Sequence, residues 1–98
     1  MKWHSAKQSV SAVREITILN ELGLHARPAA EFVRRASGFR SEIWLVKEGK
    51  RFSAASLIDI MRANIDCGTT VIMEANGSDA EAALERLAQL VREFRDED

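Results

Sequence analysis

The chain has 98 residues, 46% of them hydrophobic and 30% charged, which is enough for one domain with a modest core, so we expect no second domain. Its 14 basic and 15 acidic residues give a net charge of −1, which argues against a protein that binds nucleic acid or an anionic membrane. One cysteine and two histidines allow no internal disulfide and disfavour a zinc site, so we expect no metal ion.

No secretion signal or membrane anchor is visible, because the first residues lack an apolar core and no apolar run approaches the roughly 18 residues that span a bilayer. A cytoplasmic location is therefore expected. Residues 1–12 are polar and without periodicity, and we expect them to form an N-terminal extension that can be disordered. The folded domain is expected over residues 13–95.

The first predicted strand covers residues 13–19, because Ile16 and Ile18 alternate with polar side chains and give the strand one buried face. A loop over residues 20–23 leads into a helix predicted over 26–37, which ends where serine and glycine follow. The apolar stripe of this helix is formed by Ala29, Phe32, Val33 and Ala36.

A hairpin is predicted next, with strands over residues 41–46 and 50–53 joined by a Glu-Gly turn. A short helix is predicted over 56–65 and a further strand over 69–75. The outward faces of the strands carry apolar side chains, namely Leu19, Trp44 and Ile72. This patch is either a set of tolerated aliphatics, partly shielded by the extension with Trp3, or a dimer contact. We expect a monomer.

The C-terminal helix has the clearest amphipathic pattern in the chain. Ser78, with Glu81 three residues later, predicts a capping box at its start. Its buried stripe is predicted to contain Ala80, Ala83, Leu84, Leu87, Leu90, Val91 and Phe94. The order β-α-β-β-α-β-α predicts an α+β fold, an open-faced β-sandwich in which a four-stranded antiparallel sheet carries three helices on one face.

An anion site is predicted at the start of the first helix, in the string Gly23-Leu24-His25-Ala26-Arg27-Pro28-Ala29. Pro28 suits the first turn, because its missing N–H would have no intrahelical partner there. The N–H groups at Ala26 and Arg27 and the positive end of the helix dipole are expected to cradle a phosphate. The Arg27 guanidinium adds a permanently charged donor.

His25 is expected to be a nucleophile in this cradle. A nearby arginine and a helix N-terminus both disfavour imidazolium, so the neutral ring keeps a lone pair that can attack phosphorus. Helix-end effects of about 0.3–1 kcal/mol and charged hydrogen bonds of about 1.5–3 kcal/mol suit a group that is held and passed on. The simpler interpretation is that His25 only caps the helix or lies on the surface, as a histidine at a helix start usually does.

The string G-L-H-A-R-P-A resembles the active-site motif of the HPr family, the histidine-containing phosphocarriers of the bacterial phosphoenolpyruvate-dependent phosphotransferase system. The likeness extends with almost no gaps from about Val13 to Arg95. It implies that enzyme I phosphorylates His25, that Arg27 assists, and that an enzyme IIA domain accepts the group. It also implies a stoichiometric carrier, not an enzyme, with no cofactor.

The resemblance leaves the branch of the system open between sugar uptake and regulation. The lead-in over residues 20–24 and the acidic C-terminus look like those of nitrogen-branch carriers. The alternative from another class is an HPr-like regulatory interaction module that binds a target protein without phosphotransfer. A small-ligand-binding domain of similar topology is a third hypothesis.

A docking face beside His25 is expected, because the helix over 56–65 is more apolar than one buried face requires. The simpler interpretation is a small helix with one or two exposed aliphatics. Family members present apolar side chains of this region to their partners, and the resemblance therefore implies a docking role. The implied residues are Leu24, Ala26, Ala30, Leu57, Ile58 and Met61, with Arg34 on the rim.

Ser56 matches the serine that HPr kinase/phosphorylase modifies in some family members. Helix capping alone also explains a serine at this position. Ala55 and Asp59 stand where lysine and glycine often occur in the regulated members, which argues against regulation here. Asp59, expected to lie about 10 Å from His25, should contribute only about 0.4 kcal/mol of repulsion toward a bound phosphate before salt screening.

Overall fold

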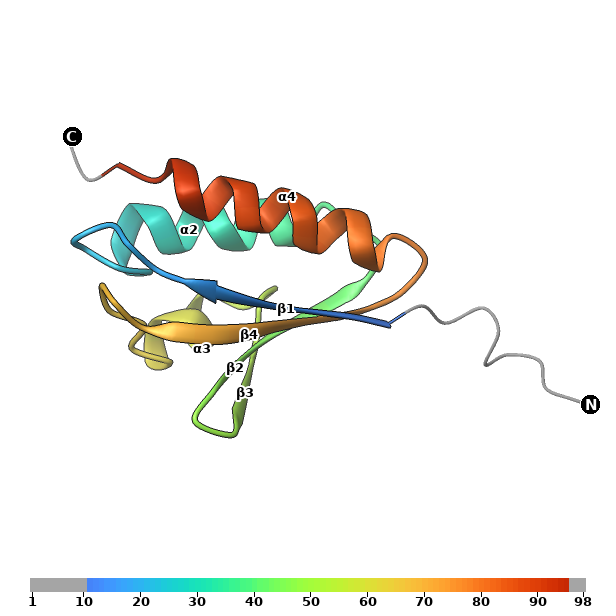
Figure 1. The fold of residues 1–98 in the computed structure, drawn as a ribbon, viewed down its shortest axis with the longest axis horizontal. Helices are drawn as coiled ribbons and strands as arrows, with labels where there is room; N and C mark the ends of the chain where they lie inside the picture. The colour runs from blue at the N-terminus through green and yellow to red at the C-terminus, as the bar shows by residue number, and fades with distance from the viewer. Residues whose placement is uncertain (1–10, 96–98) are drawn as a thin grey trace, which may run out of the picture.

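The computed structural model describes residues 11–95, which form a four-stranded antiparallel sheet with the strand order β1-β4-β2-β3 (Figure 1). In chain order the elements are β1 (Ser11–Thr17), α2 (Ala26–Ala36), β2 (Glu42–Lys47), β3 (Lys50–Ser53), α3 (Leu57–Arg62), β4 (Thr70–Asn76) and α4 (Ala80–Glu93). The predicted fold class and element order are confirmed. The predictions for residues 1–10 and for the acidic C-terminus lie outside the described residues.

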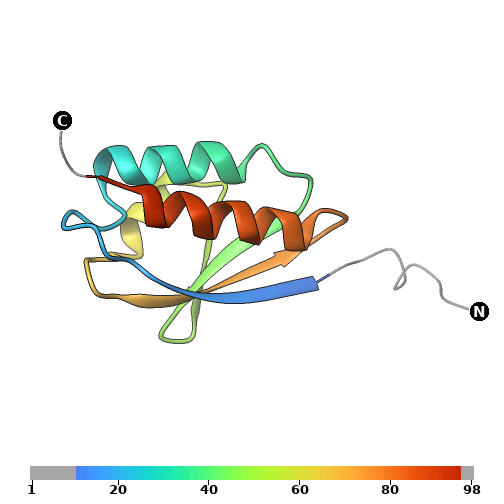
Figure 2. The ribbon, with the colours of Figure 1, turned by 45° about the horizontal axis from the view of Figure 1, so that its top comes forward.

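Two long helices cover one face of the sheet. Figure 2 shows α2 and α4 lying side by side above it, while the short α3 lies at one end, where it contacts α2 and β3. The core between these layers contains Phe32 of α2, Leu45 of β2 and Met73 of β4, all with no exposed surface. Burial of one such side chain contributes about 1.5–3 kcal/mol. The predicted stripes of both long helices are buried, with Val33 and Phe94 at their half-buried margins.

Strand β1 begins at Ser11 and ends at Thr17, two residues earlier than predicted at each end. Ser11 pairs with Asn76 at the far end of β4, and this pairing draws residues 11 and 12 into the sheet. The predicted extension is correspondingly shorter at its C-terminal end. Leu19 lies beyond β1 and does not join Trp44 and Ile72 on the open face of the sheet, so that part of the prediction is wrong.

The open face of the sheet carries Trp44 and Ile72, as the alternation predicted, but charges interrupt the apolar surface. The Arg51 guanidinium lies over the Trp44 ring, 4.3 Å from its centroid. Its Nε is also 3.4 Å from Oε1 of Glu74 on β4, which lies on the other side of β2 from β3. The indole is thus half-buried under a cation that is itself paired.

Helix α3 ends at Arg62, three residues before the predicted end. Two observations explain the early end. Asn64 has a φ of 55°, a left-handed conformation that a continuing helix does not allow. The Lys47 ammonium group donates hydrogen bonds to the carbonyl oxygens of Ala63 and Asn64, at 3.0 and 2.8 Å, and so satisfies the helix end from a neighbouring strand.

The predicted capping box of α4 is wrong. The N-cap is Asp79, not Ser78, and its side chain makes no capping hydrogen bond. Its carboxylate instead accepts hydrogen bonds from the N–H of Arg40, the N–H of Ser41 and the hydroxyl of Ser41, at 2.9, 3.0 and 2.6 Å. Asp79 and Ser41 lie in different loops, 38 residues apart in the sequence. Their tertiary contact thus occupies the carboxylate that would otherwise cap the helix.

We expect Asp79 to stabilise the fold in a pH-dependent way. The Ser41 hydroxyl and then the N–H groups of Arg40 and Ser41 hold the pKa of Asp79 below its usual range. Its stabilising effect is therefore fully present above the unfolded-state pKa and is lost as the pH falls through the folded-state pKa. In melting curves, the Tm advantage of the parent over Asp79→Asn should be constant near neutral pH and shrink below about pH 4. A Tm difference that does not change with pH would contradict this role.

Candidate functional site

His25 occupies the N-cap position of α2, with extended backbone angles of φ −125° and ψ 160°. Its side chain is 31% exposed. The loop before it is held by two reciprocal hydrogen bonds, one from the N–H of Gly23 to the Asn20 carbonyl and one from Nδ2 of Asn20 to the Gly23 carbonyl, both at 3.0 Å. The imidazole is therefore presented at the helix start by an ordered turn.

Gly23 is required by a close approach between two chain segments. Its φ is +66°, and a Cβ there would lie 2.3 Å from the Ile65 carbonyl oxygen and 2.8 Å from the Asp66 Cα. The next residue, Leu24, donates its N–H to the same Ile65 carbonyl at 2.8 Å. These contacts bring the loop between α3 and β4 next to the segment that carries His25.

Asp66 lies directly beside the imidazole, a contact that no sequence pattern predicted. Its Oδ1 is 2.8 Å from Nε2 of His25, and its side chain is 62% exposed. The sequence directed attention to Asp59 instead, but Oδ2 of Asp59 accepts a hydrogen bond from the Ser53 N–H at 3.1 Å. The expectation of an imidazole influenced by Arg27, the helix dipole and a distant Asp59 is incomplete, because the carboxylate of Asp66 is in contact with the ring.

The first turn of α2 has the electrostatic character that the motif predicted. It contains no acidic side chain, and His25 does not cap it. Arg27 is exposed at this end, and Pro28 is buried against the core. Ala26 has a φ of 50°, a strained conformation for a residue with a Cβ that costs about 1–3 kcal/mol. An anion at this end would meet the positive end of the helix dipole, although the Asp66 carboxylate lies on the other side of the imidazole ring, at Nε2.

The predicted docking residues are exposed, with one exception. Leu24 has no exposed surface and belongs to the core, because its backbone is drawn down onto Ile65. That assignment is wrong. On α3, Ile60 alone turns into the core, and the exposed side chains are Leu57 at 42%, Ile58 at 68% and Met61 at 42%. Ala26 and Ala30 are exposed, and so is Arg34, whose Nη2 is 2.6 Å from Oε1 of Glu31.

Ser56 is the N-cap of α3. Its hydroxyl oxygen accepts a hydrogen bond from the Asp59 N–H at 3.1 Å, which confirms the capping interpretation. A phosphate on this hydroxyl would replace the cap next to the Asp59 carboxylate and would be repelled by it. Phosphorylation of Ser56 by HPr kinase/phosphorylase stays a prediction.

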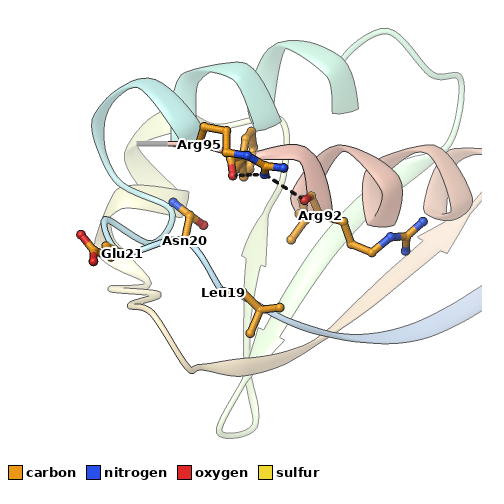
Figure 3. Close-up of a pocket in the computed structure, with 7 residues that line it drawn as sticks. Leu19, Asn20, Glu21, Arg92 and Arg95 are labelled. Carbon is orange, nitrogen blue, oxygen red and sulfur yellow. Dashed lines mark hydrogen bonds between the residues drawn. The ribbon is translucent and has the colours of Figure 1, made fainter. Parts of the chain in front are cut away.

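A cavity of about 700 Å³ lies between the loop before His25 and the end of α4. Figure 3 shows Leu19, Asn20 and Glu21 on one side and Arg92 and Arg95 on the other. Nη1 of Arg95 donates to the Phe94 carbonyl at 2.8 Å and to the Arg92 carbonyl at 3.4 Å. This guanidinium thus binds carbonyl groups at the C-terminal end of α4, which it directly follows.

Two further findings concern the described residues as a group. Between residues 11 and 95, no three histidine, cysteine, aspartate or glutamate side chains gather closely enough to hold a metal ion. In the same part of the chain, no helix has the length and apolar character to cross a membrane.

Comparison with known proteins assigns the family. The family model described as "PTS HPr component phosphorylation site" matches residues 12–93. Phosphocarrier protein NPr of Shewanella violacea is 41% identical over 80% of this chain and 86% of its own length. HPr-like protein Crh of Bacillus subtilis is 40% identical over 82% of this chain and 94% of its own length.

Solved structures agree with the sequence matches. The crystal structure of HPr-C-His from Thermoanaerobacter tengcongensis superposes with a TM-score of 0.81 at 42% identity, covering 83% of this chain and 91% of that one. The match of family model, sequence and fold extends over nearly all of the described residues. The chain belongs to the HPr family of phosphocarriers of the phosphoenolpyruvate-dependent phosphotransferase system.

Proposed function

We propose that His25 accepts a phosphoryl group from phospho-enzyme I and passes it to an enzyme IIA domain. The observation that carries this proposal is the placement of a partly exposed imidazole at the N-cap of α2, where no acidic side chain occupies the first turn. Arg27 stands two residues further, at the same helix end. A phosphoryl group on the ring would meet the helix dipole and a guanidinium.

The transfer needs no cofactor and no metal ion from this chain. The phosphorus–nitrogen bond of the donor breaks as a phosphorus–nitrogen bond to His25 forms, and the reverse exchange delivers the group to the acceptor. The protein is then a stoichiometric carrier, acting in the cytoplasm as a monomer. Because the stabilising contacts are individually modest, about 0.3–3 kcal/mol each, the group is held without becoming trapped.

The exposed apolar residues of α3 are proposed to dock both partners. Leu57, Ile58 and Met61 are each between 42 and 68% exposed, although apolar side chains of this size are favoured in the core. Ala30 and Arg34 extend this face onto α2, which packs against α3. Docking here would bring a partner's reactive group to the helix end that carries His25.

Replacing Ile58 by glutamine should weaken docking without destabilising the fold. Burial of such a side chain in an interface contributes about 1.5–3 kcal/mol, so the KM for enzyme I should rise at least about tenfold. Val13→Gln is the matched control, because Val13 is equally exposed, at 67% against 68%, but lies on β1. Steady-state phosphotransfer assays would show the difference. An equal change in KM for both variants would exclude α3 as the docking face.

The alternative is a regulatory module that binds its target while His25 stays unmodified. The relatives carry the names HPr, NPr and Crh, so membership of the family does not by itself select the sugar or the regulatory role. The same exposed α3 face would serve a regulatory target. The two hypotheses differ in whether phosphorus becomes covalently bound to the chain.

Incubation of the purified protein with enzyme I and radiolabelled phosphoenolpyruvate separates these functions. We expect one acid-labile, alkali-stable label per chain, which moves to added enzyme IIA domains. Comparing sugar-specific with nitrogen-branch IIA domains as acceptors then identifies the branch. Absence of label on a folded protein that still binds a partner would overturn the carrier proposal and support the regulatory module.

A further inference from the structure

We propose that Lys47 is a positioning residue for phosphotransfer: its ammonium group fixes the C-terminal end of α3 and thereby sets where the docking face lies relative to His25. This inference rests on the proposed docking role of α3 and adds the residue that keeps that face in place. It starts from two contacts of Lys47 Nζ, which donates to the Ala63 carbonyl at 3.0 Å and to the Asn64 carbonyl at 2.8 Å.

Helix α3 depends on contacts with the rest of the fold, because it has only six residues. Isolated helices shorter than about 12 residues are marginal in water, so tertiary contacts decide where a helix of this length forms. Within α3, Ile60 is the one side chain that is buried. The hydroxyl of Ser56 caps the N-terminal end, 3.1 Å from the Asp59 N–H. At the C-terminal end, the cap is the ammonium group of Lys47.

Lys47 suits this task because it brings a positive charge to the negative end of the helix dipole. The last carbonyl groups of a helix have no intrahelical partner, and an ammonium group offers several donors to them. Lys47 is half-buried, so solvent screens this contact less than a contact on the open surface. Its stem leaves β2 on the same face as Ile43 and Leu45, which are buried. The contact thus joins the sheet to the short helix.

The end of α3 that this lysine holds leads directly into the loop beside His25. Asn64, one of its two acceptors, precedes Ile65, whose carbonyl accepts the Leu24 N–H at 2.8 Å. Leu24 is the residue before the imidazole's own. Met61 of the docking face lies one position before the last residue of α3 and is 42% exposed. Movement of this helix end would therefore change the distance between the docking face and the imidazole.

The effect of Lys47 on phosphotransfer should appear in the KM. A surface that is ordered before its partner arrives binds more tightly, since the partner does not have to supply the ordering free energy. Once bound, the partner itself holds α3, and the imidazole is presented as in the parent. Loss of the contacts of Lys47 is therefore expected to raise the KM for enzyme I and to leave kcat almost unchanged. A purely structural role would change neither constant in the folded protein.

The first test measures the end of α3 directly, by amide hydrogen exchange. The N–H groups of Ala63 and Asn64 lie there and donate to carbonyl oxygens of α3, at 3.0 and 3.3 Å. Lys47→Met keeps the apolar stem and removes the ammonium group, and both amides should then exchange about tenfold faster, while those of α4 stay unchanged. Lys47→Arg keeps a cationic donor and should keep part of the protection. Unchanged exchange in Lys47→Met would overturn the proposal.

The second test is the steady-state phosphorylation of the same variants by enzyme I. Lys47→Met should raise the KM about threefold to tenfold at an almost unchanged kcat, and Lys47→Arg should recover part of the loss. Lys50→Met is the matched control, because Lys50 pairs with Lys47 across the hairpin and removes the same charge, but is exposed. Its KM should equal that of the parent. Melting curves establish that every variant is compared at a temperature at which it is folded.

Combination with Ile58→Gln shows whether Lys47 acts through the docking face. If it does, the two increases in KM should combine to less than their product, because the order of α3 matters less once its face is impaired. A fully multiplicative double variant, or a KM for Lys47→Met equal to that of the parent or of Lys50→Met, would overturn the role of Lys47. A parent KM for Ile58→Gln alone would instead overturn the docking role of α3 on which the inference rests.

Discussion

Replacing His25 by alanine is expected to abolish the acid-labile label completely. The proposal places the bond to phosphorus on this imidazole, and methyl hydrogens cannot replace its lone pair. The chain contains one other histidine, His4, and His4→Ala is therefore the matched control, expected to be labelled at the parent rate. Labelling with radioactive phosphoenolpyruvate and enzyme I, followed by acid and alkali treatment, measures both.

The same variant should fold normally. The His25 side chain is 31% exposed, and the contact observed for it is the hydrogen bond to a carboxylate that is itself 62% exposed. Pairs of this kind contribute about 0–1 kcal/mol, so the Tm should change little. Acid-labile label on His25→Ala at the parent stoichiometry would exclude His25 as the carrier residue.

Replacing Gly23 by alanine is expected to disrupt both stability and phosphotransfer. The added Cβ would stand 2.3 Å from the Ile65 carbonyl oxygen, so the two segments must separate, and the left-handed φ of +66° adds strain. We expect a loss of about 2 kcal/mol or more, equivalent to roughly 10 °C in Tm. The separation also moves Asp66 away from His25, and the phosphorylation rate should fall in the part of the sample that stays folded.

Gly49→Ala provides the control for this prediction. Gly49 also has a left-handed φ, of +82°, but a Cβ there would have no neighbour within 4 Å. This variant should lose only the conformational part, about 1 kcal/mol, and should be phosphorylated at the parent rate. Thermal melts and labelling rates of the two variants separate the close approach from the strain. Equal losses in both would show that the contact with Ile65 is unimportant.

The exposed apolar face of α3 was predicted from the sequence only in part. The sequence showed that Leu57, Ile58, Ile60 and Met61 could not all be buried, because a helix has one face toward the core. It did not show which of them turns inward. The structure assigns that place to Ile60 and leaves the other three exposed.

Local patterns in the sequence determined the element order, most element boundaries to within two residues and the helix start at His25. The alternation at Ile16 and Ile18 and the hairpin strand over 50–53 involve neighbours in the chain, and such short-range signals are legible without a structure. The position of His25 before Pro28 is equally local.

Only the tertiary structure decided which distant groups meet. It placed Asp66 on His25, buried Leu24 against Ile65, and turned Asp79 from its helix cap toward Ser41. Each of these contacts joins residues about 40 positions apart, through backbone hydrogen bonds and close approaches that no local propensity encodes. The sequence alone therefore determined that His25 stands at a helix start, and the packing of the loops decided which carboxylate faces its imidazole.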